Sequence, residues 1–296
     1  MRPISDNTVI QIEIAVGACH LSCANCTRMI GHHRNPKFMD LDTVRQAIAS
    51  LDGFQGRIGC MGGEPALHPQ FREVLAIFRD MIPDRRRREF WTSGWKWPEY
   101  RDDILATFDE DRIAYNDHTQ ETGRHTPLLV AIEEVVEDAE LRRILIDNCP
   151  FQARWSASIT PKGGFFCEIA AAQDWLFDGP GGYPIEPGWW RKGPADFQDQ
   201  VERYCGRCSG ALPLLSQPDN RGGRDGLSVD WVSPGNLARL KAAGSPRIAK
   251  GGYRVFDRKL SAEDIEAMRQ GWQPRQFRPF VAHNPEDVTR ALRSVP

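Results

Sequence analysis

The chain has 296 residues, of which 41% are hydrophobic and 26% are charged, and its formal net charge is −2. This composition is that of an ordinary globular protein with enough length for one large domain or two modest ones. Acidic and basic residues are interspersed, which favours neither a nucleic acid nor a membrane as the main partner. No apolar run approaches the ~20 residues of a membrane-spanning helix, and residues 1–7 lack the apolar core of a signal peptide, so we expect a cytoplasmic protein.

Strand and helix candidates alternate in the first half of the chain. Residues 9–16 are an apolar strand candidate, and a helix with Asp40 or Asp42 as its N-cap follows. Further strands are expected over residues 57–60, 88–92 and 112–115, and further helices over residues 71–82, 100–108 and 128–136. This alternation predicts an α/β fold with a parallel sheet or barrel, whose active site lies at the loops that follow the strands.

Eight cysteines in a chain without an export signal predict metal ligands or reactive thiols rather than disulfides, because the cytoplasm is reducing. They fall into a three-cysteine loop, a single residue and a four-cysteine group. These are Cys19, Cys23 and Cys26; Cys60; and Cys149, Cys167, Cys205 and Cys208.

The three-cysteine loop directly follows the first strand candidate. Three thiolates can bind three irons of a 4Fe–4S cubane and leave the fourth iron open to a small molecule. A structural zinc ion needs four ligands, so His20, His32 or His33 would have to complete a zinc site. The spacing leaves both possibilities open and favours the open cluster.

A turn of sequence Gly62-Gly63-Glu64-Pro65 ends the second strand candidate. Glycine lets the backbone approach a ligand closely, and Glu64 offers a carboxylate to a cationic group. The alternative is a plain strand–helix turn with proline at the first helical position. The turn follows the cysteine loop by one helix and one strand, and this position favours the functional interpretation.

A CxxxCxxC loop after the first strand and a GGEP turn after the second resemble the radical S-adenosyl-L-methionine (SAM) superfamily, over about residues 8–140. The resemblance implies a partial (β/α)6 barrel. It also implies that Cys19, Cys23 and Cys26 hold a 4Fe–4S cluster whose open iron binds the amino and carboxylate groups of SAM.

The resemblance also implies a set of SAM contacts, chiefly the amino group at Gly63 and Glu64. The candidates are Gly62, Gly63, Glu64, Pro65, Thr92 and Ser93. Asn116 and His118, polar residues at the end of the next strand candidate, are added to them, with a capping role as the alternative. Thr92 and Ser93 stand where the family has a polar turn near the ribose and adenine. Asn25 departs from the family, which usually has an aromatic residue before the third cysteine, so the adenine would pack differently here.

Residues 155–160 and 165–169 predict a β-hairpin, and the four-cysteine group brackets it and ends in a CxxC. This layout resembles the twitch domain, the short form of the SPASM domain, with a spacing similar to that of 2-deoxy-scyllo-inosamine dehydrogenase. The resemblance implies an auxiliary iron–sulfur cluster of the 4Fe–4S type, closed by four thiolates and used for electron transfer. A zinc knuckle of four cysteines is the alternative.

We therefore expect three regions, followed near the end by a helix over residues 262–270 with Ser261 as its cap. They are a radical SAM core in residues 1–145, a twitch-type domain in residues 146–215 and an extension of unknown role in residues 216–296.

Two further features have competing interpretations. Cys60 is either a small buried hydrophobe or a hydrogen-atom donor near the substrate, which would suit an epimerase. The arginines at residues 85–88 predict a solvated turn, with a docking patch for an acidic electron carrier as the alternative.

The resemblance implies an enzyme that receives an electron from a flavodoxin- or ferredoxin-like donor and cleaves SAM to a 5′-deoxyadenosyl radical. We expect this radical to take hydrogen from a carbon of a small-molecule substrate, and the enzyme to oxidise or epimerise a hydroxylated compound such as a sugar or aminocyclitol. Maturation of a ribosomally made peptide is the alternative, although the chain begins almost at the first strand and leaves no room for a leader-binding domain. A non-catalytic zinc protein is the alternative from a different class.

Overall fold

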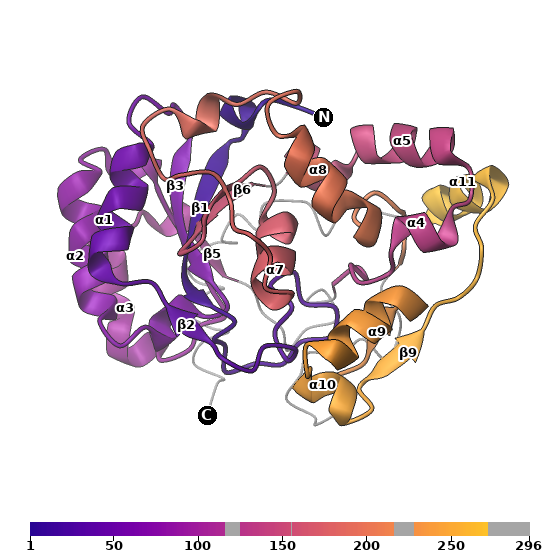
Figure 1. The fold of residues 1–296 in the computed structure, drawn as a ribbon. Coiled ribbons are helices and arrows are strands. Elements are labelled where there is room, and N and C mark those ends of the chain that lie inside the picture. Colours follow the sequence, from indigo (N-terminus) through magenta and orange to yellow (C-terminus); the bar gives the residue numbers. More distant parts are fainter. Residues whose placement is uncertain (116–124, 155, 216–227, 272–296) are drawn as a thin grey trace.

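A computed structural model describes residues 1–115, 125–154, 156–215 and 228–271. Its strands are β1 (Val9–Val16), β2 (Lys37–Phe38), β3 (Arg57–Gly62), β4 (Arg88–Thr92), β5 (Ile113–Tyr115), β6 (Ala157–Thr160), β7 (Gly163–Phe165), β8 (Asp230–Val232) and β9 (Tyr253–Val255). In this described part, seven strands form one sheet of order β5-β4-β3-β1-β6-β7, with β2 on β1, and β8 and β9 form a second sheet. The fold is therefore mixed α/β (Figure 1).

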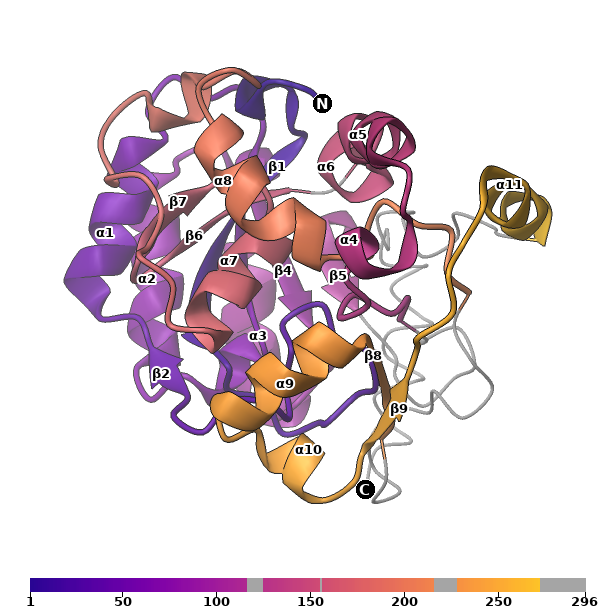
Figure 2. The ribbon, with the colours of Figure 1, turned by 45° about the vertical axis from the view of Figure 1, so that its right-hand side comes forward.

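Helices pack on both faces of the large sheet. They are α1 (Leu41–Ser50), α2 (Phe71–Met81), α3 (Trp97–Thr107), α4 (Ile132–Val135), α5 (Ala139–Asp147), α6 (Pro150–Arg154), α7 (Glu168–Leu176), α8 (Gln198–Tyr204), α9 (Pro234–Ala242), α10 (Pro246–Ala249) and α11 (Ala262–Gly271). Helices α1, α2 and α3 lie on one face, and α7 and α8 lie on the other (Figures 1 and 2). Among the described helices, none is both long and apolar enough to cross a bilayer.

Strands β5, β4, β3, β1 and β6 run parallel. Every residue of β1 is buried, as expected for a parallel strand covered by helices on both faces. Helix α1 begins after the predicted cap Asp40, whose carboxylate accepts a hydrogen bond of 2.8 Å from the Thr43 amide. The elements expected up to residue 115 are confirmed to within three residues at each end.

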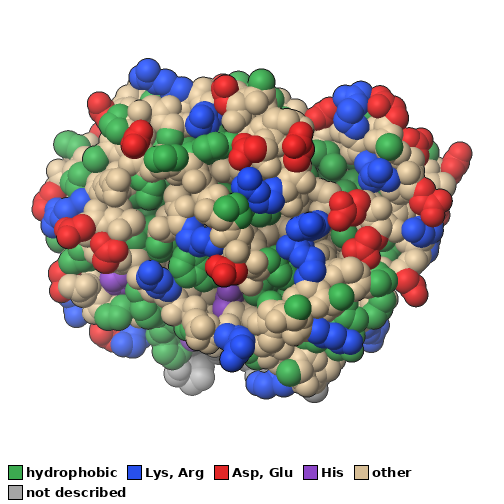
Figure 3. Space-filling view, in the orientation of Figure 1, with side chains coloured by type: hydrophobic (Ala, Val, Ile, Leu, Met, Phe, Trp, Pro, Cys, Tyr) green, Lys and Arg blue, Asp and Glu red, His purple; other side chains and the backbone are tan. Residues whose placement is uncertain are grey.

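The two faces of the sheet differ in chemistry. Cys60 and Phe90 are in register on β3 and β4, and the Phe90 ring packs on Phe71 of α2 with centroids 5.8 Å apart. The opposite face is polar, because Gln11 of β1 donates a hydrogen bond of 3.4 Å to Glu89 of β4. The outer surface seen in Figure 3 carries interspersed acidic and basic side chains.

The helix expected over residues 128–136 forms only in its second half, as α4, and its first half is not helical. Leu129 is extended and makes a parallel bridge with Val232, and the amide of Val130 donates to the Ser209 hydroxyl at 3.3 Å. Tertiary partners therefore take the backbone groups that a helix would have used.

A hairpin is present, since β6 and β7 pair antiparallel, but the prediction of its second strand is wrong: the strand is Gly163–Phe165 and not residues 165–169. Cys167 is the N-cap of α7 instead of a strand residue. Strand β6 also pairs in parallel with β1, so the hairpin continues the main sheet.

Several elements gave no clear pattern in the sequence, among them α5, α7, α8 and the unit from β8 to β9. The helix near residue 262 is confirmed as α11, and the amide of Asp264 donates to the Ser261 hydroxyl at 3.2 Å. The described part of the C-terminal region is residues 228–271.

Candidate functional site

The three-cysteine loop leaves the end of β1 and is largely enclosed. Cys23 is 5% exposed, and Cys19 and Cys26 are half-buried. Burial raises the pKa of Cys19 and of Cys26, and the nearby Cys26, Glu64 and Cys23 raise that of Cys19 further. The thiols of Cys19 and Cys26 are therefore neutral in the metal-free protein, and metal binding must displace their protons.

The turn after β3 packs directly against this loop. The amide of Gly63 donates to the carbonyl of Ala15, and that of Glu64 to the carbonyl of Ala18, both at 2.8 Å. A Cβ on Gly63 would lie 2.1 Å from the Ala18 oxygen and 3.1 Å from the Cys19 Cβ. Glycine is thus required at the point where the turn meets the first cysteine.

The side chain of Glu64 is fully buried at 0% exposure and has four donors. Its carboxylate accepts hydrogen bonds from the Ala66 amide at 3.1 Å, the Thr92 hydroxyl at 2.9 Å, and the Ser93 amide and hydroxyl at 2.8 and 2.6 Å. Burial raises the pKa of Glu64, and these hydrogen bonds oppose that rise. Three separately predicted residues, Glu64, Thr92 and Ser93, therefore meet at one site.

Of the remaining predicted SAM contacts, two have structural roles in the turn after β3. Gly62 ends β3 in register with Ala15, and Pro65 begins the 3-10 helix Pro65–Leu67, for which Glu64 is the N-cap. The turn thus also has the plain strand–helix role. Asn116 and His118 lie outside the described residues.

An aromatic pair that the sequence analysis missed lies beside this site. The rings of His20, in the cysteine loop, and Trp95 are stacked with centroids 4.4 Å apart. Trp95 is 36% exposed, and its position two residues after Ser93 is the signal that could have drawn attention to it.

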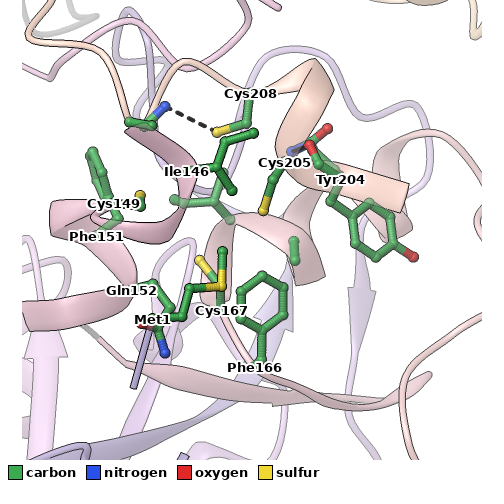
Figure 4. A pocket seen from close by; sticks show the side chains of 15 residues that line it. Met1, Ile146, Cys149, Phe151, Gln152, Phe166, Cys167, Tyr204, Cys205 and Cys208 are labelled. Atoms are coloured by element: carbon green, nitrogen blue, oxygen red, sulfur yellow. Dashed lines mark hydrogen bonds between the residues drawn. The ribbon is translucent and has the colours of Figure 1, made fainter. Parts of the chain in front are cut away.

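The four-cysteine group lines a single half-open cavity (Figure 4). Cys149 precedes α6, Cys167 caps α7, and Cys205 and Cys208 flank the short turn after α8. Most of the other lining residues are apolar, such as Ile146, Phe151, Phe166, Ile169 and Ala170, and the polar ones are Gln152, Gln173 and Tyr204. The empty space is about 420 Å³, including the part open to solvent.

All four of these cysteines have a raised pKa because they are buried. The pKa of Cys167 is raised to about 12, and Cys149, Cys208 and Cys167 add to the rise at Cys205. The amide of Gly210 donates to the sulfur of Cys208 at 3.2 Å. Four thiols facing one apolar cavity form a donor set that fits an iron–sulfur cluster.

Among the residues that the structure describes, no three His, Cys, Asp or Glu side chains lie close enough to hold a single metal ion. A cubane binds each thiolate at a different iron, so its ligands are spaced more widely than those of one ion.

Two of the histidines considered as zinc ligands are engaged elsewhere. His32 bonds through Nδ1 to the Ser245 hydroxyl at 2.7 Å and through Nε2 to Asp230 at 2.5 Å. His33 bonds through Nε2 to the carbonyl of Arg28 at 2.9 Å. Both ring nitrogens of His32 are thus already used by protein groups.

A buried ion-pair network joins the two cysteine sites. Arg28, two residues after Cys26, contacts Glu13 at 2.6 Å and Glu168 at 2.8 Å, and Glu168 directly follows Cys167. All three side chains are at most 5% exposed. Burial alone would lower the pKa of Arg28, but Glu13 and Glu168 outweigh it and raise the pKa. No sequence signal indicated this network, because its members are far apart in the chain.

Cys60 lies in the core on the face of the sheet that α1, α2 and α3 cover (Figure 1). It is fully buried, in register with Phe90, and burial raises its pKa. The polar side chains of Gln11 and Glu89 lie on the opposite face. This placement favours the role of a small buried hydrophobe over that of a hydrogen donor.

The prediction of a solvated arginine turn is wrong for Arg88. It is 6% exposed and donates to the carbonyls of Ile82 at 2.8 Å, Thr107 at 2.9 Å and Arg79 at 3.1 Å. These carbonyls lie at the ends of α2 and α3, where helices leave acceptors unsatisfied. Arg86, by contrast, is exposed.

No family model and no curated protein matches the chain. Two solved structures of BtrN are similar to it. One is a complex with AdoMet and 2-DOIA, with 16% identity, a TM-score of 0.40 and coverage of 68% of this chain and 88% of that chain. The other is selenomethionine BtrN in an open conformation, with 16% identity, a TM-score of 0.40 and coverage of 73% and 95%. Likenesses this weak carry no conclusion about function.

Proposed function

We propose that this chain is a radical SAM enzyme whose three-cysteine loop holds a 4Fe–4S cluster with one open iron. The parallel sheet with α1, α2 and α3 is then the partial (β/α)6 barrel of that superfamily. One observation carries the proposal: the turn at Glu64 and the cysteine loop, separated by a helix and a strand in the sequence, are in contact through the Glu64 amide and the Ala18 carbonyl at 2.8 Å.

The residues at this contact suit a ligand with an ammonium and a carboxylate. Three thiolates leave one iron of a cubane for such a ligand. Glu64 is a buried carboxylate that Thr92 and Ser93 hold in place beside the cysteine loop, and an ammonium group would bind it by replacing one of its present donors. The absence of a side chain at Gly63 lets the turn pack directly on the cysteine loop, which places Glu64 beside the three cysteines.

When bound, the cluster supplies the electron that cleaves SAM to methionine and a 5′-deoxyadenosyl radical. The contribution of the protein is to orient SAM at Glu64 and to keep water away from the enclosed loop. The fully buried Glu64 and the low exposure of Cys23 support that second role.

The four-cysteine group is assigned by the same proposal to an auxiliary iron–sulfur cluster in a twitch-type region. Cys149, Cys167, Cys205 and Cys208 supply four thiolates, which leave no position for substrate and so suit electron transfer. A group that accepts an electron favours oxidation of the substrate. The burial of Cys60 on the face of the sheet that α1, α2 and α3 cover weighs against its role as the hydrogen donor that epimerisation would need. The favoured reaction is therefore oxidation of a hydroxylated small molecule, such as a sugar or an aminocyclitol.

The test is anaerobic reconstitution followed by metal analysis and a SAM-cleavage assay. We expect about eight irons and eight sulfides per chain, charge-transfer absorption, and 5′-deoxyadenosine formation with a reduced flavodoxin or dithionite. Cys23→Ala is expected to abolish 5′-deoxyadenosine formation. Bound zinc without charge-transfer absorption, or unchanged 5′-deoxyadenosine formation in Cys23→Ala, would reject the proposal.

A further inference from the structure

An arginine from the C-terminal region donates hydrogen bonds to the backbone of the three-cysteine loop. Arg247 donates from Nη1 to the carbonyl of Cys23 at 3.0 Å, and from Nη2 to the carbonyl and hydroxyl of Ser22 at 2.9 and 2.7 Å. Its Nη1 also pairs with Asp230 at 2.6 Å. Arg247 is 5% exposed and Asp230 is 1% exposed, so solvent does not screen these contacts.

Asp230 holds the loop at two further points. One of its oxygens accepts the amide of Asn25 at 2.5 Å, and the other bonds His32 at 2.5 Å. The Asn25 side chain returns the contact by accepting the Trp231 amide at 3.0 Å. Asn25 has the left-handed φ of 49°. The radical SAM family usually has an aromatic residue at the position of Asn25. The hydrogen bonds to Asp230 and Trp231 and the left-handed φ explain why asparagine is suited to it here.

Gly31 fits the same contact from the loop side. Its φ is +94°, and a Cβ there would lie 2.5 Å from Nη2 of Arg247. The Gly31 carbonyl also accepts the Arg247 amide at 3.1 Å. A residue with a side chain at this position would push the guanidinium away from the loop.

The unit that carries Asp230 and Arg247 is anchored independently on the body of the protein. Asn236 of α9 donates to the carbonyls of Leu129 at 2.9 Å and Arg207 at 2.8 Å. Arg207 lies between Cys205 and Cys208, so the unit touches both cysteine sites. In Figures 1 and 2, α9, α10 and β9 lie together at one side of the sheet.

The hydrogen-bond chain Ser245–His32–Asp230 has the order of a hydrolase triad, but it is part of this support. Ser245 is 2% exposed, and its hydroxyl accepts the Ile248 amide at 3.3 Å as the N-cap of α10. A nucleophile needs access to its substrate, and this serine is instead a helix cap.

We propose that Asp230 and Arg247 are positioning residues that hold residues 22–32 in the conformation in which the three thiolates can bind their cluster. This gives the C-terminal region a role in the function. The ordering of the loop stands on the contacts alone, and the binding of a cluster rests on the proposed function.

The first experiment is hydrogen exchange of the metal-free protein, which does not depend on the cluster. Arg247→Met is compared with Arg88→Met, because Arg88 is an equally buried arginine that binds backbone carbonyls far from the loop. Peptides covering residues 19–33 are expected to exchange at least about tenfold faster in Arg247→Met than in Arg88→Met. Asp230→Asn, which keeps the size of the side chain, should show the same change. Equal exchange in Arg247→Met, Asp230→Asn and Arg88→Met would overturn the proposal.

The second experiment is reconstitution of the same variants with iron and sulfide. Arg247→Met is expected to lose the part of the electron paramagnetic resonance (EPR) signal that responds to SAM, while Arg88→Met keeps it. Arg247→Lys keeps the charge but not the planar fork, so it should recover only part of the signal. A full SAM-responsive signal in Arg247→Met would contradict the positioning role. If the wild-type protein binds no cluster, the proposed function fails, and the exchange experiment still decides whether Arg247 orders the loop.

Discussion

The two cysteine sites are built in opposite ways. The loop site takes its cysteines from eight consecutive residues, and the turn at Glu64 and Arg247 both contact the loop from outside. The cavity site takes its cysteines from separate segments that meet where α6, α7 and α8 pack together. A local motif thus defines the first site, and tertiary packing defines the second. Within the described part of the chain, the buried carboxylate beside the loop site, Glu64, has only uncharged donors, whereas the one beside the cavity site, Glu168, is paired with Arg28.

The largest difference between the sites should appear when each loses a cysteine. Cys23→Ala is expected to reduce 5′-deoxyadenosine formation to background. Cys205→Ala should keep SAM cleavage but lose oxidised product, because the electron from the substrate then has no acceptor. Liquid chromatography of 5′-deoxyadenosine and product measures both. Loss of SAM cleavage to the same extent in both variants would mean that the sites do not have separate roles.

The next largest effect is expected at the ion pair that joins the two sites. Glu168→Gln leaves Arg28 with one charged partner in a buried position and should destabilise the metal-free protein by about 3 kcal/mol. Urea denaturation measures this loss. Glu140→Gln, which breaks the exposed pair with Arg143, is the matched control and should have no measurable effect. If Glu168→Gln and Glu140→Gln have the same free energy of unfolding, the buried ion pair does not contribute to stability.

A smaller effect, confined to the loop site, is expected for Glu64→Gln. The amide keeps the size of the side chain but removes the charge that would bind the SAM ammonium, so the Kd for SAM should rise about tenfold. Calorimetry with the reconstituted protein measures this change, and the iron content of the cavity site should stay constant. An unchanged Kd would remove Glu64 from the SAM site.

The smallest effect is expected for Cys60→Ala, which alters neither site. Loss of a buried sulfur should cost about 1 kcal/mol of stability and leave turnover unchanged. Thermal unfolding and turnover in deuterated water measure the two quantities. Loss of deuterium incorporation at the product carbon would restore Cys60 as a hydrogen donor and favour epimerisation.

Local features of the fold and site could be predicted from the sequence. The cysteine loop, the turn at Glu64 and the alternating elements up to β5 depend on residues close together in the chain, so spacing and periodicity reveal them. Contacts between distant segments have no such signature. Arg28 and Glu168 form an ion pair although they are far apart in the sequence, Arg247 reaches Ser22 and Cys23, and the extended stretch at Leu129 follows from its pairing with Val232.

The central claim is that the loop site binds SAM and the cavity site does not. EPR spectra of reduced, reconstituted Cys205→Ala and Cys23→Ala, recorded with and without SAM, test it most directly. We expect SAM to change the spectrum of Cys205→Ala, which keeps the loop ligands, and to leave that of Cys23→Ala unchanged. A SAM-dependent change in Cys23→Ala, or none in Cys205→Ala, would contradict the account.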